Sequence, residues 1–197
     1  METLIEDVLT YINNAVRFAM MDPAATLLVF MLFALVIITP GRRVSEKIIM
    51  ALVFCYIYLI LTSNVLARGV YEERLYSFKL FTSGRRDMVE NYILFIPLGM
   101  LMCGLDLITK PVRPWKNKKA YRVVRFITSM IFALIFTCVI EGLQLYLKVG
   151  VFTLDDILCN ETGALSGYVF ILVIVLLVKK FGKGSKEVKA EQTNEQQ

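Results

Sequence analysis

Long blocks of apolar residues, separated by short polar segments, restrict the fold of this sequence more than any other feature. A block of this length can cross a bilayer as a helix, because each backbone polar group then finds its hydrogen-bond partner within the segment. The hydrophobic residues, 57% of the chain, are gathered in these blocks. The predicted spans are Ala24–Thr39, Ile48–Leu66, Tyr92–Ile108, Val123–Leu147 and Ile157–Val178. The sequence therefore predicts an all-α, polytopic membrane protein, a bundle of about five transmembrane helices.

The two ends of the chain differ from these blocks in composition. Residues 1–22 have apolar side chains at helical spacing and polar side chains on the other face. This pattern predicts an amphipathic helix in the membrane interface, preceding a transmembrane domain of residues 23–180. Residues 181–197 are polar and rich in Lys, Glu and Gln. We expect them to form a disordered cytoplasmic tail.

The distribution of basic residues indicates the orientation of the chain. With the N-terminus outside, 15 of the 22 Lys and Arg residues lie on the cytoplasmic side and 7 outside. This agrees with the preference of cytoplasmic segments for Lys and Arg. We expect a multi-pass protein of the cell membrane with its N-terminus outside and its C-terminus in the cytoplasm. The reverse orientation is the alternative, because residues 68–86 also carry five basic side chains.

The composition gives no support for nucleic-acid, metal or cofactor binding. The net charge of +5 follows the two membrane sides, so it does not indicate a nucleic-acid partner. The chain has no histidine, and its four cysteines lie in separate segments without CxxC spacing. The commonest general base and the usual zinc ligand are therefore missing. We predict neither a metal site nor a cofactor.

Acidic and amide side chains gather where the last two spans meet. Glu141 and Gln144 share a helix face at the end of the fourth span, and Asp156 and Asn160 share one at the start of the fifth. Asn91 opens the third span on the same side. An ionisable residue inside a span is costly, so Glu141 in particular indicates function. We expect an outward-facing polar site in which the two carboxylates lie within about 10 Å, one helix diameter.

Some of these residues also have local structural explanations. Thr153 and Asp156 match a capping box, in which Thr153 caps the fifth helix. The amides of the site can act as hydrogen bonds between helices. Asp106 lies four residues before Lys110, which predicts a local ion pair.

Small residues and a proline follow the polar positions. Gly163 and Gly167 have the spacing that lets two helices approach closely, and we expect them to bring the fourth and fifth spans together. Pro97 and Gly99 interrupt the third span below Asn91. The residues assigned to helix packing are Pro97, Gly99, Gly163 and Gly167.

Together these residues resemble the pattern of the VanZ-like family of membrane proteins, over about residues 55–178. That pattern has Asn-x-x-x-Phe-x-Pro-x-Gly at the start of one span, Glu-x-x-Gln at the end of a later span, and Asp with Asn and Gly at +4 and +7. The matching residues are Asn91, Phe95, Pro97 and Gly99, then Glu141 and Gln144, then Asp156, Asn160 and Gly163. The family usually has an Arg in the loop before that Asp. Gly150 stands there in this chain, and we expect Lys148 to supply the cation.

The resemblance implies an integral membrane protein of the bacterial cell envelope that contributes to low-level resistance to teicoplanin. Its polar site would bind or shield an envelope lipid, a lipid-linked cell-wall precursor or a lipoglycopeptide. The alternative is an intramembrane enzyme acting on a lipid-linked precursor, with carboxylates as acid and base or as ligands of Mg²⁺ or Ca²⁺. The oxygen ligands would be Glu90, Asp155, Asp156 and Asn160. The sequence has no recognisable nucleophile–base pair or phosphate-binding glycine loop, which favours binding over catalysis. A transporter is disfavoured by the lack of an inverted repeat.

Overall fold

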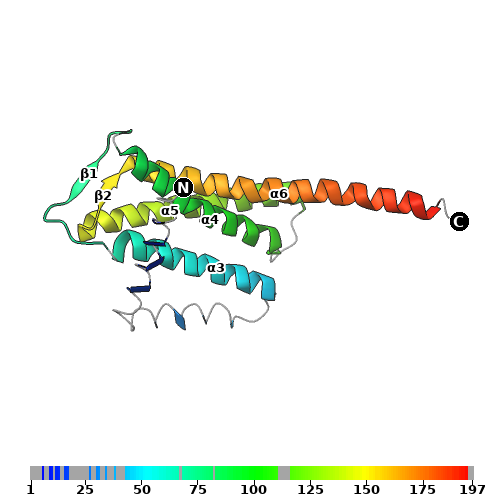
Figure 1. Cartoon of the computed structure of the whole chain (residues 1–197), viewed down its shortest axis with the longest axis horizontal. Coiled ribbons are helices and arrows are strands. Elements are labelled where there is room, and N and C mark those ends of the chain that lie inside the picture. Colours follow the sequence, from blue (N-terminus) through cyan, green and yellow to red (C-terminus); the bar gives the residue numbers. More distant parts are fainter. Residues whose placement is uncertain are drawn as a thin grey trace.

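The computed structural model describes residues 43–66, 68–81, 83–110 and 116–194, isolated positions before residue 43, and side chains as far as Lys180. Four long helices form a bundle in this part of the chain (Figure 1). They are α3 (Val44–Leu61, continued by the π-helical turn η1, Thr62–Leu66), α4 (Arg85–Ile108), α5 (Lys118–Leu147) and α6 (Leu154–Asn194).

By length and composition, each of these helices can cross a membrane, which is the arrangement of a multi-pass membrane protein. The candidate spans are Val44–Leu66, Arg85–Ile108, Lys118–Leu147 and Leu154–Lys180. They correspond to the last four of the five predicted spans. The first predicted span, residues 24–39, and the predicted amphipathic helix, residues 1–22, lie outside the described residues apart from isolated positions.

The helices end close to the predicted positions but begin earlier, because polar residues at the membrane surface continue each helix beyond its apolar block. In α4 the added turns contain an ion pair, in which Arg86 Nε lies 2.6 Å from Glu90 Oε1. In α5 the side chain of Asn117 caps the first turn, accepting hydrogen bonds from the backbone N–H groups of Lys119 and Ala120 at 2.9 and 3.2 Å. Such caps satisfy N–H groups that have no partner within the helix.

Helix α6 continues to Asn194, where the sequence analysis expects a disordered tail from residue 181. In Figure 1 this helix extends beyond the other three. The sequence of residues 186–193, KEVKAEQT, consists mostly of residues with high helix propensity, which accounts for the difference.

Two short strands correct the expectation of an all-α chain. β1 (Leu75–Ser77) and β2 (Val151–Thr153) pair in parallel, with Leu75 opposite Val151 and Ser77 opposite Thr153. They join the segment before α4 to the segment before α6 at one end of the bundle, which we call the strand end (Figure 1). The predicted topology placed both segments on one membrane side, but their pairing had no signal in the sequence.

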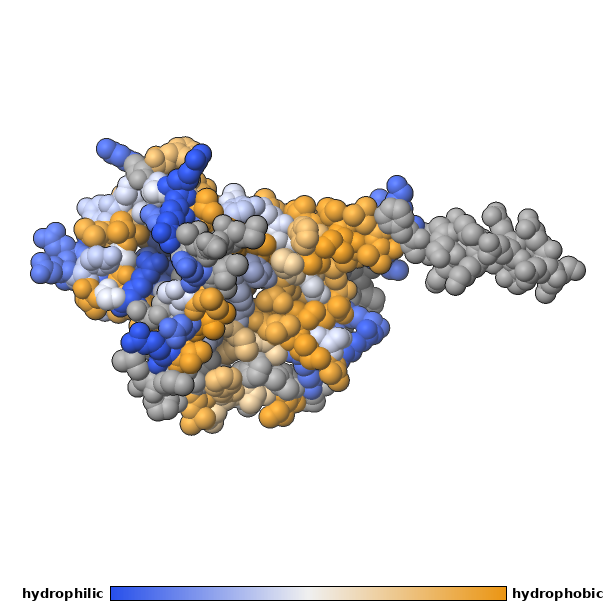
Figure 2. Space-filling view, in the orientation of Figure 1, coloured by the Kyte–Doolittle hydropathy of each residue, from blue (hydrophilic) through white to orange (hydrophobic). Residues whose placement is uncertain are grey.

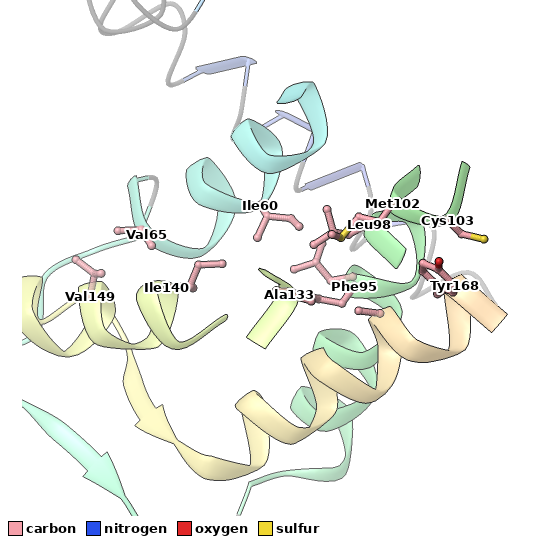
Figure 3. Packing of buried hydrophobic residues seen from close by; sticks show 12 residues of the cluster. Ile60, Val65, Phe95, Leu98, Met102, Cys103, Ala133, Ile140, Val149 and Tyr168 are labelled. Atoms are coloured by element: carbon pink, nitrogen blue, oxygen red, sulfur yellow. The ribbon is translucent and has the colours of Figure 1, made fainter. Parts of the chain in front are cut away.

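The buried core is small and the apolar surface is large. Figure 3 shows core side chains that converge from the four helices, among them Ile60, Phe95, Ile140 and Tyr168. In the most apolar stretch of each helix, no more than 33% of the residues are buried inside the protein. The remaining apolar side chains form a broad surface that Figure 2 shows beyond the polar strand end. Soluble monomers rarely expose an apolar surface of this extent, whereas lipid chains cover it in a membrane.

The small residues bring α6 against α4, and not against α5 as the sequence analysis expected. At three positions a Cβ atom added to glycine would collide with a backbone carbonyl of the other helix. The contacts are Gly163 with Tyr92, Gly167 with Ile96, and Gly99 with Ala164. These glycines therefore lie where α4 and α6 approach closely, and the helix facing Gly163 and Gly167 is α4. Glycines on both helices allow this backbone approach.

Pro97 lies inside α4, where it removes the donor for the carbonyl of Ile93, four residues earlier. A neighbouring helix supplies a hydrogen bond at the next carbonyl: Tyr56 Oη of α3 donates to Leu94 O at 2.6 Å. Within a membrane such bonds replace those that a proline disrupts. The hydrogen bond from Tyr56 therefore joins α3 to α4 close to Pro97.

Candidate functional site

A pocket of about 520 Å³ opens at the strand end. It is formed by residues from the starts of α4 and α6 and from the two segments that carry the strands. Its lining residues are Arg68, Tyr71, Ser77, Ser83, Gly84, Asp87, Glu90, Asn91, Gly150, Val151, Thr153 and Asp156. Of the five site residues predicted from the sequence, Asn91 and Asp156 line the pocket.

Asp156 presents an unused hydrogen-bond acceptor at the pocket. The side chains of Thr153 and Asn91 lie beside its carboxylate, so α4 and α6 meet at this group. Its Oδ1 atom is buried and has no hydrogen-bond partner among the described residues. A buried carboxylate oxygen without a donor is costly, and a ligand that brings an N–H or O–H group would satisfy it.

Glu141 lies behind the pocket wall, with 2% of its surface exposed. Its Oε2 atom accepts a hydrogen bond from the backbone N–H of Thr153 at 3.4 Å. Thr153 Oγ1 in turn accepts one from the backbone N–H of Asp156 at 3.0 Å, which confirms the predicted cap. Thr153 thus links Glu141 to the start of α6. Glu141 positions the pocket wall, and Asp156 faces the pocket.

Gln144 also lies behind the pocket, where it joins α5 to the π-helical turn η1. Its Nε2 donates to the carbonyl of Asn64 at 3.1 Å, and both side chains are almost completely buried. Asn64 Nδ2 donates to Ile60 O at 3.0 Å, and its Oδ1 accepts from Arg68 Nη2 at 3.3 Å. Single π-helical turns occur frequently at functional sites. Here the turn places Asn64 behind the pocket, where it accepts a hydrogen bond from Arg68, which lines the pocket.

Arg68 supplies the cation that the sequence analysis assigned to Lys148. Lys148 ends α5 in the left-handed conformation, and its Nζ donates to Glu72 O at 2.9 Å, in the segment before β1. Arg68 lines the pocket instead, and its charge acts on both Glu141 and Asp156. A Cβ atom added at Gly150 would lie 3.2 Å from Arg68 Nη1. The guanidinium therefore lies beside the position where the resemblance predicts an Arg.

Asp155 anchors the loop before α4 and does not line the pocket. Its carboxylate oxygens accept hydrogen bonds from the backbone N–H groups of Phe81 at 2.7 Å and Ser83 at 2.9 Å. Phe81 has a left-handed backbone, with φ of 60°. A carboxylate that accepts two backbone bonds fixes such a turn. Asp155 therefore shapes the pocket by positioning Ser83 and Gly84.

Asn160, the fifth predicted site residue, lies below the pocket in the helix interface. Its Nδ2 donates to Thr137 Oγ1 of α5 at 2.7 Å, and both residues are buried. This is the interhelical hydrogen bond that the sequence analysis gave as its structural alternative. Asn160 Oδ1 has no hydrogen-bond partner among the described residues.

At the opposite end of the bundle, Asp106 has other partners than the expected Lys110. Asp106 Oδ1 lies 2.5 Å from Arg125 Nη2 of α5. Its Oδ2 accepts hydrogen bonds from Ser129 at 2.7 Å and from Tyr168 at 3.0 Å. The expected local ion pair is replaced because the side chain of Asp106 is directed into the α4–α5–α6 interface. Asp106 joins three helices.

Arg68 and Asn64 were not among the site residues predicted from the sequence. Asn64 is a polar residue inside a predicted span, which is a signal of function or of a helix contact. Arg68 follows that span directly, on the side of the acidic residues. Both signals were present, but the contacts of Asn64 with Gln144 and of Arg68 with Gly150 depend on how η1 packs against α5.

The pocket lining is more acidic than basic, with the carboxylates of Asp87, Glu90 and Asp156 against the guanidinium of Arg68. Arg86 partly offsets Glu90. Hydroxyl and amide groups complete the lining, so a ligand with several hydroxyl or ammonium donors would find acceptors there. In the described residues, no group of three or more His, Cys, Asp and Glu side chains is arranged to hold a metal ion.

In comparisons with known proteins, the matched part of the chain includes this pocket. The family model described as VanZ/LLP1 matches residues 23–177, a range that includes every residue of the pocket lining. The chain is similar to Protein VanZ of Enterococcus faecium, with 23% identity over 132 residues, 64% of this chain and 73% of that protein. No solved structure matches.

Proposed function

The chain belongs to the VanZ/LLP1 family, and from this premise we propose that the strand end faces the outside of the cell membrane and binds the polar part of an amphiphilic envelope molecule. The ligand is a lipid-linked cell-wall precursor or a lipoglycopeptide. Binding shields this molecule, or alters access to it, and contributes to low-level resistance to teicoplanin.

The single observation that carries this proposal is the unsatisfied Asp156 Oδ1 atom in a pocket of polar groups. A volume of about 520 Å³ lies within the range of small-molecule sites. It fits one or two sugar rings or a short peptide, but not a whole lipoglycopeptide. Hydroxyl and ammonium groups of such a fragment can donate to Asp156 and Asp87, while Arg68 binds an anionic or carbonyl group.

The surface next to the pocket suits the apolar part of such a ligand. The helices below the strand end expose large apolar side chains, including Val89 of α4 and Leu158 of α6. A ligand with its polar group in the pocket can therefore keep an acyl chain among the lipids against these helices. A purely water-soluble ligand would gain nothing from this surface.

The charge distribution supports the proposed orientation. In the described part of the chain, ten basic residues lie opposite the strand end, around the starts of α3 and α5, the end of α4 and the end of the membrane-spanning part of α6, against six at the strand end. Basic segments are preferentially retained in the cytoplasm. The pocket would then face the compartment in which cell-wall precursors are assembled.

The test compares two pocket variants with a control in a bacterial host that depends on this chain for reduced teicoplanin susceptibility. Asp156→Asn weakens the acceptor in the pocket, and Glu141→Gln weakens the acceptor that positions Thr153. Glu73→Gln removes an exposed carboxylate at the strand end that does not line the pocket. We expect the first two to abolish the phenotype at normal membrane protein levels, and Glu73→Gln to preserve it.

A double variant, Asp156→Asn with Glu141→Gln, should be no worse than either single variant, because the two carboxylates act through the same wall. Full activity of both single variants would refute the proposal. Lipid extracts separate it from the enzymatic alternative. A lipid species that appears only with the unaltered protein and disappears with Glu141→Gln would indicate catalysis.

A further inference from the structure

The end of the bundle opposite the strands contains a second site, which is independent of the proposed function. Two adjoining hollows of about 430 and 330 Å³ lie between the end of α4, the start of α5 and α6. They share the lining residues Asp106, Leu107, Tyr121, Arg122, Leu172 and Leu176. From their charge, depth and apolar walls, we infer that they bind one anionic phospholipid of the adjacent leaflet.

The mouth of the site is cationic. Lys118, Arg122 and Lys179 line the larger hollow, and each is exposed. None of the three forms an ion pair with a carboxylate in the part of the chain that the structure describes. The acidic lining residue, Asp106, is already paired with Arg125 at 2.5 Å. The positive charge of the mouth is therefore available to an anion.

The depth of the site matches a lipid that lies across the membrane surface. Lys118 begins one candidate span and Lys179 lies at the end of another, so both reach the headgroup level. Leu172 precedes Lys179 by seven residues, which places it about 10 Å deeper along α6 at a rise of ~1.5 Å per residue. A phosphate at the cations thus leaves the glycerol and acyl chains beside Leu172 and Leu176.

The walls distinguish a phospholipid from a free anion. The smaller hollow is lined mostly by apolar side chains, including Phe126, Leu172 and Leu176. Two buried polar atoms have no hydrogen-bond partner among the described residues: Thr109 Oγ1 at the larger hollow and Arg125 Nε at the smaller one. Basic pockets between transmembrane helices are known to bind anionic headgroups. An inorganic phosphate would use the cations but not the apolar wall.

The test measures lipid binding to the full-length protein in detergent by native mass spectrometry. The probes are dioleoyl phosphatidylglycerol and, as the neutral comparison, dioleoyl phosphatidylcholine. We expect a preference for phosphatidylglycerol of at least about tenfold. In the double variant Arg122→Gln with Lys179→Gln, affinity for phosphatidylglycerol should fall about 30-fold, since each basic residue near a membrane surface contributes about a fivefold factor.

Two further variants make the result specific. Arg74→Gln with Arg85→Gln removes the same charge from exposed positions at the strand end and should leave binding unchanged. Arg122→Lys with Lys179→Arg keeps the charge and should retain binding, which separates lost contacts from misfolding. Equal affinity of the two glutamine double variants would overturn the inference. Displacement of the lipid by excess sodium phosphate would also overturn it, since the cations would then bind a free anion.

Discussion

The contact between α4 and α6 gives the sharpest test of the fold. Gly163→Ala would place a Cβ atom against the carbonyl oxygen of Tyr92 on α4. A backbone atom cannot move aside by changing a rotamer, so one helix must shift. Overpacking of this kind typically costs 1–3 kcal/mol, and we expect the free energy of unfolding to fall by about 2–3 kcal/mol.

A matched control comes from another helix of the same bundle. Gly142 lies in α5, and a Cβ atom added there would meet nothing within 4 Å. Gly142→Ala therefore has only the effect of helix propensity, a gain of about 0.5–1 kcal/mol. The two alanine variants should differ by about 3 kcal/mol in unfolding free energy, although their chemical change is identical.

The assay is reversible unfolding in mixed detergent micelles, followed by circular dichroism. Gly104→Ala provides an intermediate case, because the added atom would lie 3.4 Å from Ile49 Cδ1, the flexible end of a side chain. We expect it to be near neutral. If Gly163→Ala is as stable as Gly142→Ala, α4 and α6 do not approach as described. The position of Asp156 beside Asn91 would then also be wrong.

Two further predictions concern the pocket and the orientation. Arg68→Gln should reduce the teicoplanin resistance. Adding Gly150→Arg should restore part of it, because the Cβ atom of the new side chain lies beside the position of the Arg68 guanidinium. No recovery would show that Arg68 acts only by bonding Asn64. With the four native cysteines replaced, Glu73→Cys should react with a membrane-impermeant reagent in intact cells and Lys116→Cys should not. The opposite pattern of labelling would place the pocket in the cytoplasm.

The sequence alone was sufficient to identify the four described helices that can span a membrane and the residues at their ends. A helix in lipid satisfies its own backbone, so each apolar block specifies its structure without reference to the others. The ends at Leu66, Ile108 and Leu147 were therefore predictable. Glu141 was also identifiable as unusual, because the cost of a carboxylate inside a span depends on depth and not on which helix lies nearby.

Which helices touch was decided only by the tertiary structure. The spacing of Gly163 and Gly167 predicts a close helix contact, but it does not say whether α4 or α5 provides the partner. Because lipid chains are as apolar as leucine, no difference in hydrophobicity selects that partner; shape and a few hydrogen bonds do. The pairing of β1 with β2 was hidden for a similar reason, since three-residue strands have no periodic signal.

In the candidate site, too, the sequence determined some features and the tertiary structure decided the others. The sequence placed Glu141, Gln144 and Asp156 at one end of the chain's predicted bundle, because helix geometry and membrane sidedness determine where each side chain lies along the membrane normal. Separating Asp156 in the pocket from Glu141 behind its wall required the position of Thr153 between them. Finding Arg68 beside Gly150 required the packing of η1 against α5, which arises from contacts between residues about 80 positions apart, such as Gln144 with Asn64. Such long-range contacts depend on side-chain shape and leave no local pattern in the sequence.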